Sequence, residues 1–462
     1  MGAIRLAELP FDIIDLIISA IPSHRDLVSL AAVSTTCKDL IIPRHTEYRR
    51  LRLEAPHPEV WAHLAQRPDL ARNIREVTIR EGAPGLGPSE FTGPERYPIA
   101  LVEAPSQSHP AATVASHICQ ALRNMDALRN FTWVEAWHPR GSFYNMPNYH
   151  HDVFQALKDS KSLVQLKLLD TMDIHDAVNV EDYPLWHIAD LQTLILRPLV
   201  YWPLAGLKSM LLRSPNLQNL DICLPAALPI FAECRFSQLR RLHLVVSTGS
   251  IGEQVIAKFL EHHHTIESLH WYPKYETTLR LSPGSLPILK RLITSPGFAC
   301  SILSDLTVPN RAIECVSQLS VDERTLSILD SINTSQLRDL RVWRYAGLES
   351  INLVAQRFPQ LTHLEIPKFG IPTRIDSDND YTIDDYILTL SKFSSLEYLL
   401  DSSIWSLLKL AGEEKIASLA ALCPNLQRLG HFNTQRSAYV DIVLSRDNGI
   451  ISWREEIARS QE

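Results

Sequence analysis

Apolar residues recur along most of the chain in one short pattern, L-x-x-L-x-L, whose last two apolar positions lie two residues apart. Clear copies read SKSLVQLKL at 160–168, SPNLQNLDI at 214–222, FSQLRRLHL at 236–244, FPQLTHLEI at 358–366 and CPNLQRLGH at 423–431. Because side chains alternate between the two faces of a strand, residues two apart point to the same face. Each copy therefore predicts a short strand with one buried face.

The copies are numerous and unevenly spaced. From Leu128 onward they follow one another at intervals of 22 to 37 residues. One strand of this length buries too little to be stable, but many side by side form a continuous parallel sheet with a shared core. The first apolar residue of each copy is Ile74, Leu128, Leu163, Leu191, Leu217, Leu239, Ile266, Leu303, Leu337, Leu361, Leu396 or Leu426.

Two places depart from the regular pattern. The segment LPILKRL at Leu286–Leu292 competes with the copy at Leu303. We prefer Leu303, because Thr294 breaks the last apolar position of the first segment whereas Val308 satisfies that of the second. The last two copies carry Asp401 and His431 in that position, as expected of terminal repeats that cap a stack.

Between the copies the apolar period changes from 2 to about 3.6, which predicts amphipathic helices. A proline often separates helix from strand, as at Pro215, Pro359 and Pro424, where it stops the helix. The repeating unit is therefore a strand, a loop, a helix and a return. The clearest helical segments are 113–125, 251–263, 352–358 and 415–422.

This series resembles the leucine-rich repeat family, in its irregular form with longer helices and CPNL or FPQL before the strand. The resemblance covers roughly residues 70–435. It implies an α/β solenoid with a parallel sheet on the concave face and helices on the convex face.

The first fifty residues follow a different pattern, which predicts three short helices. Pro10 suits the first turn of a helix, and Pro22 ends that helix. Ser23, with Asp26 three residues later, reads as a capping box for a second helix, and Ser34 is placed to cap a third. Helices this short cannot bury all their isoleucines and leucines among themselves, so apolar surface remains for a partner.

This N-terminal segment resembles an F-box. The matching positions are Leu9-Pro10, Asp12, Ile13-Ile14, Ile17, Ile21-Pro22, Asp26-Leu27, Leu30, Val33-Ser34, Cys37-Lys38 and Leu40. The resemblance implies docking on the Skp-family adaptor of a Skp–cullin–F-box ubiquitin ligase and, through that adaptor, on a cullin. The residues implied to pack on the adaptor are Leu9, Pro10, Ile13, Ile14, Ile17 and Leu27.

Together the two patterns divide the chain. The resemblances predict a small all-α F-box at residues 1–52 and a connector at 53–70. We expect repeats over 71–435, with a Gly/Pro-rich insertion near 82–110, and a C-terminal cap or tail at 436–462.

Charge and composition narrow the class of partner. The net charge of −7 disfavours general binding to nucleic acid backbones. The seven scattered cysteines, an odd number, predict reduced thiols rather than a disulfide framework. No signal peptide and no run of 18 apolar residues is apparent, so we expect a protein of the cytoplasm or nucleus without a membrane span.

Three motifs resemble metal-binding sites, but each lacks the residues or the geometry that such a site needs. The adjacent histidines of EHHHT at 261–265 would point in different directions on a helix, and His150-His151 have the same defect. The acidic stretch from Asp376 has Tyr381 where a calcium loop needs Gly and Ile387 where it needs Glu. We therefore expect no catalytic residues, no metal and no cofactor, and we do not expect an enzyme.

The polar side chains that flank the buried pair of each strand would line the concave face, on the order of 50 Å long. Arginines and aromatic residues there are of the types enriched at binding hot spots, and the positive residues suit an acidic or phosphorylated segment. The flanking residues are Gln165, Lys167, Thr193, Arg197, Asn219, Asp221, Arg241, His243, His270, Tyr272, Asp305, Arg341, Trp343, His363, Glu365 and Arg428. From these we select, as substrate-binding, Lys167, Arg197, Arg241, His243, His270, Tyr272, Arg341, Trp343 and His363.

Two functions follow as hypotheses. The first is a substrate-recognition subunit of a ubiquitin ligase, which binds the adaptor through its F-box and a protein substrate through its repeats. The alternative is a leucine-rich-repeat scaffold with no role in ubiquitination, whose N-terminal helices only cap the first repeat. The alternative predicts that Ile13, Ile14 and Leu27 pack on that repeat, whereas the first hypothesis predicts that several of them stay exposed.

Overall fold

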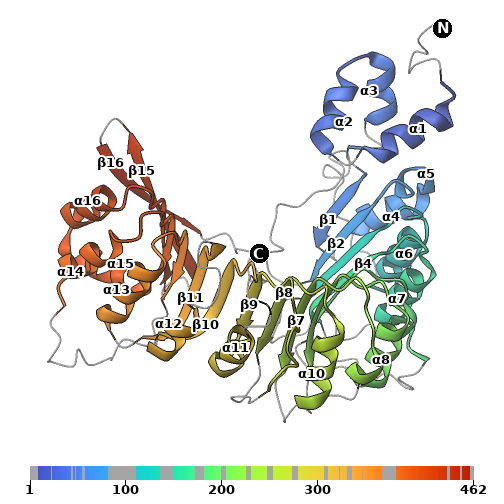
Figure 1. Cartoon of the computed structure of the whole chain (residues 1–462). Helices are drawn as coiled ribbons and strands as arrows, with labels where there is room; N and C mark the ends of the chain where they lie inside the picture. The colour runs from blue at the N-terminus through green and yellow to red at the C-terminus, as the bar shows by residue number, and fades with distance from the viewer. Residues whose placement is uncertain are drawn as a thin grey trace, which may run out of the picture. The chain divides into compact units, whose positions relative to one another are not determined.

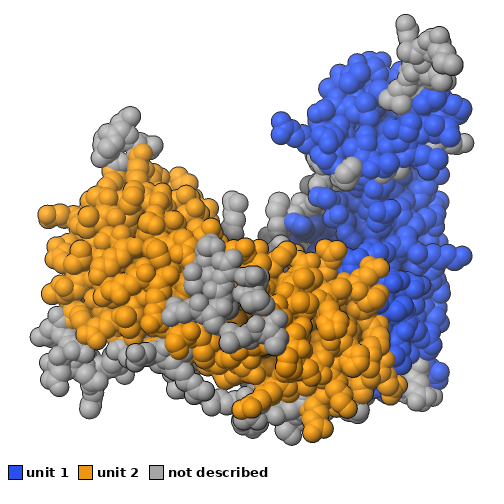
Figure 2. Space-filling model, in the orientation of Figure 1, with its two compact units in different colours: residues 1–223 blue, residues 224–462 orange. Residues whose placement is uncertain are grey.

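The structure is a computed structural model of the 462-residue chain. Two compact units, Met1–Cys223 and Leu224–Glu462, are distinguished in Figure 2 and described separately. The described residues are 9–21, 23–42, 45–46, 48–54, 58–81, 111–135, 149–171, 182–198, 204–224, 230–246, 253–272, 279–305, 308, 311–321, 323–329, 336–345, 347–366, 381–433, 438–447 and 450–457.

The first unit begins with the three predicted helices, α1 (Phe11–Ala20), α2 (His24–Ala31) and α3 (Thr35–Ile41) (Figure 1). Both predicted serine caps are present, although at Ser23 only one half of the predicted capping box forms. Pro10 is the N-cap of α1, the Ser23 hydroxyl accepts a hydrogen bond from the backbone N–H of Asp26, and the Ser34 hydroxyl accepts one from that of Cys37. Each hydroxyl satisfies a backbone donor that has no partner within its helix.

These helices have a small core of their own. Leu9, Ile21, Leu30 and Leu40 are partly buried against it. The helices are thus held together by contacts among themselves. The core residues are Ile14, Ile18, Leu27, Ala31, Cys37 and Ile41.

The rest of the first unit is a parallel sheet whose strands are neighbours in chain order. Leu51, Val77 and Phe131 pair in register on successive strands and are all buried, as the two-residue period predicts. The strands are β1 (Arg50–Glu54), β2 (Glu76–Glu81), β3 (Asn130–Glu135), β4 (Gln165–Thr171), β5 (Thr193–Pro198) and β6 (Asn219–Leu224).

Helices alternate with these strands and cover one face of the sheet (Figure 1). The sheet starts at Arg50, earlier than the predicted repeat boundary at residue 71, and two helices occupy the range predicted as a connector. The predicted insertion at 82–110 lies outside the described residues. The helical elements are α4 (Pro58–Gln66), α5 (Pro68–Ala71), α6 (Ala111–Arg123), α7 (Tyr149–Asp159), the 3₁₀ turn η5 (Pro184–His187) and α8 (Leu204–Leu212).

The second unit repeats the arrangement, again with parallel strands in chain order through β14. The strands are β7 (Arg241–Val246), β8 (Ser268–Tyr272), β9 (Arg291–Thr294), β10 (Cys315–Val321), β11 (Asp339–Tyr345), β12 (His363–Glu365), β13 (Tyr398–Leu400), β14 (Arg428–Asn433), β15 (Ala438–Asp447) and β16 (Ile450–Ile457). The helices are α9 (Ile230–Glu233), α10 (Glu253–His262), α11 (Pro296–Leu303), α12 (Glu323–Leu329), α13 (Leu348–Arg357), α14 (Ile383–Leu390), α15 (Ser402–Ala411) and α16 (Glu413–Leu422).

The prediction of a strand copy at Leu303 is wrong. Leu303 is the last residue of α11, a helix that begins at Pro296. The rejected segment forms β9 instead, with Thr294 completely buried in the position that we expected to be apolar. The next strand, β10, follows Ile313, which the repeat pattern missed. A threonine has the same branched shape as a valine, so it can fill the last buried position of the strand. Our requirement for an apolar residue at this position was therefore too strict.

The predicted C-terminal cap forms a hairpin. Strand β15 pairs antiparallel with β14, and β16 pairs antiparallel with β15. The parallel sheet of the second unit therefore ends in two antiparallel strands, the first of which covers the edge of β14. The architecture is α/β with a mostly parallel sheet, compatible with a solenoid. None of the helices in the described parts of the chain combines the length and apolar character needed to cross a membrane.

Candidate interaction surfaces

An apolar stripe runs along the outside of α1. Ile13, Leu16 and Ile17 are 43%, 66% and 39% exposed, and their spacing places them on one side of the helix. Pro10, at the start of α1, is exposed as well. We call Ile13, Leu16 and Ile17 the α1 stripe. Large apolar side chains grouped in this way are typical of surfaces that bind another protein.

Three residues predicted to face the adaptor contribute instead to the core of the three helices. Ile14 and Leu27 are buried in the core of the three helices, and Leu9 packs partly against that core. Ile14 and Leu27 therefore support the helices and offer no surface, whereas Leu9 keeps part of its side chain exposed. Leu16 was not among the residues that the F-box resemblance assigned to the adaptor contact. It is more exposed than either Ile13 or Ile17. Its helical spacing from Ile13 was the signal that could have identified it.

A polar contact joins α1 to the segment before β1. The side chains of Asp15 and His45 are 3.0 Å apart, and His45 is almost fully buried. Burial lowers the pKa of His45, while the hydrogen bond and charge of Asp15 oppose that shift. Close by, the Tyr48 hydroxyl is 3.0 Å from the Nε2 atom of His63 on α4.

The open face of each sheet, opposite the helices, carries predicted polar side chains from several strands. In the first unit Lys167 lies in register between Thr132 and Ile195, and Ile195 is followed by Asp221. The Arg197 guanidinium donates to Asp221 Oδ2 at 2.6 Å. This arginine is therefore neutralised by a neighbour, contrary to the expectation of a positive face there.

In the second unit Arg341 is neutralised in the same way. Its guanidinium lies 3.2 Å from an oxygen of Asp339 and 3.5 Å from one of Glu365. Burial alone would lower the pKa of Arg341, but the two carboxylates raise it above the usual value. Arg428 faces Asp441 at 3.7 Å. Strands β11 to β14 thus present compensated charges.

Strands β7 to β9 differ, because positive and ionisable side chains gather there without a carboxylate among the paired positions. The rings of His243 and His270 stack with centroids 3.7 Å apart and an interplanar angle of 7°. Arg241 is exposed, and it is in register with Ser268 and then with Arg291. Sequence reasoning missed Arg291 because it rejected the segment that forms β9. We call Arg241, His243, His270 and Arg291 the β7–β9 patch.

The other predicted residues are distributed as follows. His363 on β12 contacts the hydroxyl of Thr362 and lies with its ring tilted toward Tyr398. Tyr272 and Trp343 lie on β8 and β11, and their side chains are outside the described part of the structure.

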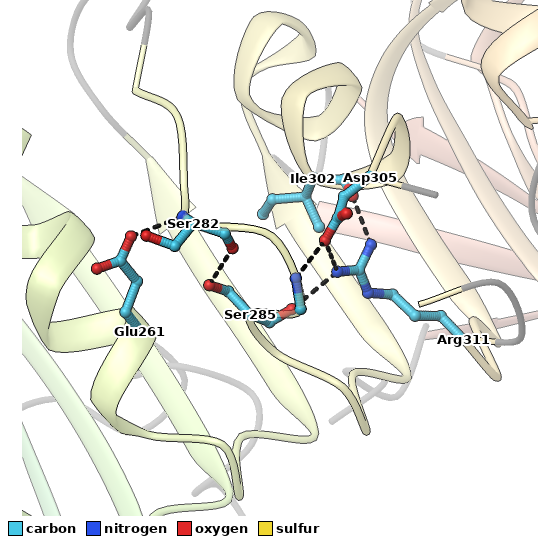
Figure 3. Close-up of polar contacts among 7 residues, drawn as sticks. Glu261, Ser282, Ser285, Ile302, Asp305 and Arg311 are labelled. Atoms are coloured by element: carbon cyan, nitrogen blue, oxygen red, sulfur yellow. Dashed lines mark hydrogen bonds and ion pairs between the residues drawn. The ribbon is translucent and has the colours of Figure 1, made fainter. Parts of the chain in front are cut away.

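Asp305 was expected on the open face, and this is wrong. It lies just after α11 and binds a buried arginine (Figure 3). Arg311 donates to Asp305 Oδ2 at 3.0 Å and to the backbone carbonyls of Ile302 at 2.6 Å and Ser285 at 2.8 Å. The same Asp305 oxygen accepts from the backbone N–H of Gly284 at 3.0 Å. This cluster, which we call the Arg311 cluster, fixes the irregular connection between β9 and β10.

The histidine-rich motifs have structural roles. His263 is buried, where its Nε2 atom accepts from the backbone N–H of Phe236 at 2.9 Å and its Nδ1 atom lies 2.6 Å from the carbonyl of Phe259. His150 packs on the ring of Trp133 with centroids 4.9 Å apart. Among the described residues, no group of three or more His, Cys, Asp or Glu side chains is placed to hold a metal ion.

The acidic stretch from Asp376 is described only from Tyr381 onward. There Thr382 and Asp385 form a capping box at the start of α14, with each side chain bonded to the other's backbone N–H.

Comparison with protein-family models and with curated proteins finds no match to this chain. What the protein binds is therefore inferred from its own surfaces.

Proposed function

We propose that this protein is the substrate-recognition subunit of a Skp–cullin–F-box ubiquitin ligase. The single observation that carries the proposal is the α1 stripe on a helical segment with its own core. The scaffold alternative expects Ile13, Ile14 and Leu27 to pack on the first repeat. Ile13 is instead exposed, whereas Ile14 and Leu27 are buried in the core of the three helices, so one residue of the three supports the proposal.

Adaptor binding has a clear driving force. Fully burying a large aliphatic side chain contributes about 1.5–3 kcal/mol, so Ile13, Leu16 and Ile17 together supply a substantial part of a protein interface. The hydrophobic core beneath them holds α1 in place before binding, which lowers the ordering cost. The contact surface on this side is formed by α1, with Pro10 at its start.

Substrate capture would use the open face of the sheets. Ubiquitin transfer needs a target lysine held near the conjugating enzyme, and the protein contributes by raising the effective concentration of that lysine. No residue of this chain performs chemistry in that scheme. The β7–β9 patch is the part of the open face best suited to an acidic segment, because Arg241 and Arg291 lie in one register row, on either side of Ser268.

The decisive experiment measures binding of the full-length chain to a purified Skp-family adaptor by calorimetry or surface plasmon resonance. The variant Leu16→Glu, Ile17→Glu should weaken binding by about 30-fold or more, which corresponds to at least ~2 kcal/mol. Leu410→Glu is the matched control, since Leu410 is 86% exposed on α15 and has no role in the proposed contact. Leu9→Ala, Pro10→Ala tests the start of the helix independently.

The outcomes separate the two hypotheses. Tight binding that Leu410→Glu preserves and the α1 variant loses is the expected result. Absence of binding by the full-length wild-type chain would contradict the proposal and favour a scaffold unrelated to ubiquitination.

A further inference from the structure

Two arginines on the open face of the second unit carry no bound counter-charge. Arg241 on β7 and Arg291 on β9 lie in one register row, with Ser268 of β8 between them. Neither guanidinium forms an ion pair or a hydrogen bond with another residue in the described part of the chain. We call Arg241, Ser268 and Arg291 the arginine row.

A third arginine on this open face is compensated, which makes the arginine row distinct. Arg341 lies 3.2 Å from an oxygen of Asp339 and 3.5 Å from one of Glu365. Asp339 is also the next carboxylate beyond Arg291 in register, two strands further along. Because Asp339 is bound to Arg341, it leaves the charge of Arg291 uncompensated.

The carboxylate on the other side of the row is occupied as well. Glu267 precedes Ser268 in the chain, and its charge interacts with that of Arg241. Its oxygens, however, lie 3.0 Å from the ammonium group of Lys290 and 3.5 Å from the guanidinium of Arg240. An acidic partner would therefore be the first carboxylate to bind Arg241 directly.

Both guanidinium groups can be reached from solvent. Arg241 is exposed and Arg291 is half-buried. The buried nitrogen atoms that lack a hydrogen bond include none from Arg291, so its guanidinium nitrogens contact solvent. The hydroxyl of Ser268 is accessible for the same reason. The row thus offers three sets of hydrogen-bond donors to a partner.

The register of the strands sets the distance between the two positive charges. Neighbouring strands lie about 4.8 Å apart, so the Cα atoms of Arg241 and Arg291 are about 10 Å apart. A segment in the polyproline II conformation has three residues per turn and advances about 3.1 Å per residue, so side chains three positions apart point the same way at about 9 Å. A fully extended strand instead presents side chains on one side at about 7 or 13 Å, which fits the row less well.

We infer that the arginine row holds a substrate segment in the polyproline II conformation with two acidic residues three positions apart. The inference rests on the proposed role of the open face in substrate capture and specifies the class of segment. Each carboxylate would accept two parallel hydrogen bonds from one guanidinium. The Ser268 hydroxyl would donate to a main-chain carbonyl between the two acids, since the backbone of this conformation has no internal hydrogen bonds.

The test is binding of labelled peptides to the full-length chain by fluorescence anisotropy, at low ionic strength so that the charges are not screened. The probes are short proline-rich peptides of one composition, with two glutamates placed two, three, four or seven positions apart. Spacing by three should give binding about five-fold tighter than spacing by two or four. Spacing by seven matches one face of a helix, and tighter binding of that peptide would overturn the inference.

Variants identify the residues responsible. Arg241→Gln and Arg291→Gln should each weaken binding of the preferred peptide about five-fold and abolish the preference for its spacing. Arg338→Gln is the matched control, because it removes the same charge from an exposed arginine of the same unit that is outside the row. Equal weakening by Arg338→Gln would contradict the inference.

The comparison of peptides on the wild-type chain does not depend on the folding of any variant. Equal binding of all spacings would overturn the inference, and so would tighter binding of a matched peptide with a single phosphoserine. Adaptor binding is measured on the same protein. Adaptor binding without a spacing preference would contradict this inference alone, whereas a spacing preference without adaptor binding would contradict the ligase proposal alone.

Discussion

The three N-terminal helices and the strands that follow them use apolar residues in opposite ways. In the strands the buried pair faces the helices, and charged or polar side chains such as Lys167, Arg241 and Glu365 lie on the other face. In the helices a small core is complete, yet Ile13 and Leu16 remain outside it. The exposed apolar side chains beside this complete core are the basis of the proposed adaptor contact, whereas the charged side chains of the strands are readily solvated.

The two regions also differ in the contacts that stabilise them. The strand copies depend on their neighbours, since each is too small to have a core alone. The helical segment keeps its own core and is tied to the sheet region by polar contacts such as that between Asp15 and His45. A destabilising substitution in one strand copy should therefore also destabilise the neighbouring copies. A destabilising substitution in the three helices should affect those helices alone.

The largest effect is expected from Arg311→Leu. This change removes one donor from the Asp305 carboxylate, which keeps its hydrogen bond from the backbone N–H of Gly284, and one from each of the carbonyls of Ile302 and Ser285, in a place where Arg311 is almost fully buried. Loss of one partner of a buried ion pair costs about 3 kcal/mol or more in the free energy of unfolding. Urea denaturation followed by circular dichroism measures it, with Arg240→Leu as an exposed control. A loss below ~1 kcal/mol would show that the Arg311 cluster is dispensable.

A somewhat smaller and more local effect is expected from Leu27→Ala. Truncating this fully buried leucine should cost about 3 kcal/mol within a core of few residues. Hydrogen exchange should rise throughout residues 11–41 and stay unchanged in β3 to β5. Faster exchange in those strands would contradict the idea that the helices are stabilised by themselves. Val28→Ala, at an exposed neighbouring position, serves as the control.

The smallest effect concerns pH. Burial lowers the pKa of His150 from 6.5 to about 4, so the unfolded chain binds this proton more tightly than the folded chain. The resulting stability is complete above about pH 6.5 and is lost progressively as the pH falls toward about 4. Urea midpoints at pH 7 and pH 5 should differ less for His150→Phe than for wild type. His151→Gln, at an exposed position, should retain the wild-type difference.

Much of the fold was predictable because its signals are local. The helix starts at Ser23 and Ser34 depend on side chains that reach a backbone N–H three residues away. The copies at Leu217 and Leu361 depend on strict alternation of apolar residues. The errors occurred where a distant contact decides the outcome: Thr294 is accepted in the core because the surrounding strands enclose it, and Asp305 turns inward because Arg311 is buried beside it.

The candidate surfaces show the same division. Sequence alone determined the apolar and polar periods, and through them the α/β class, the three N-terminal helices and the strands that follow. Only the tertiary structure decided which side chains remain available. Ile14 is buried while Ile13 is not, Arg197 and Arg341 are paired with carboxylates, and Arg241 and Arg291 fall in one register row. Periodicity is a property of neighbouring residues, but exposure and charge compensation depend on segments far apart in the chain, which only folding brings together.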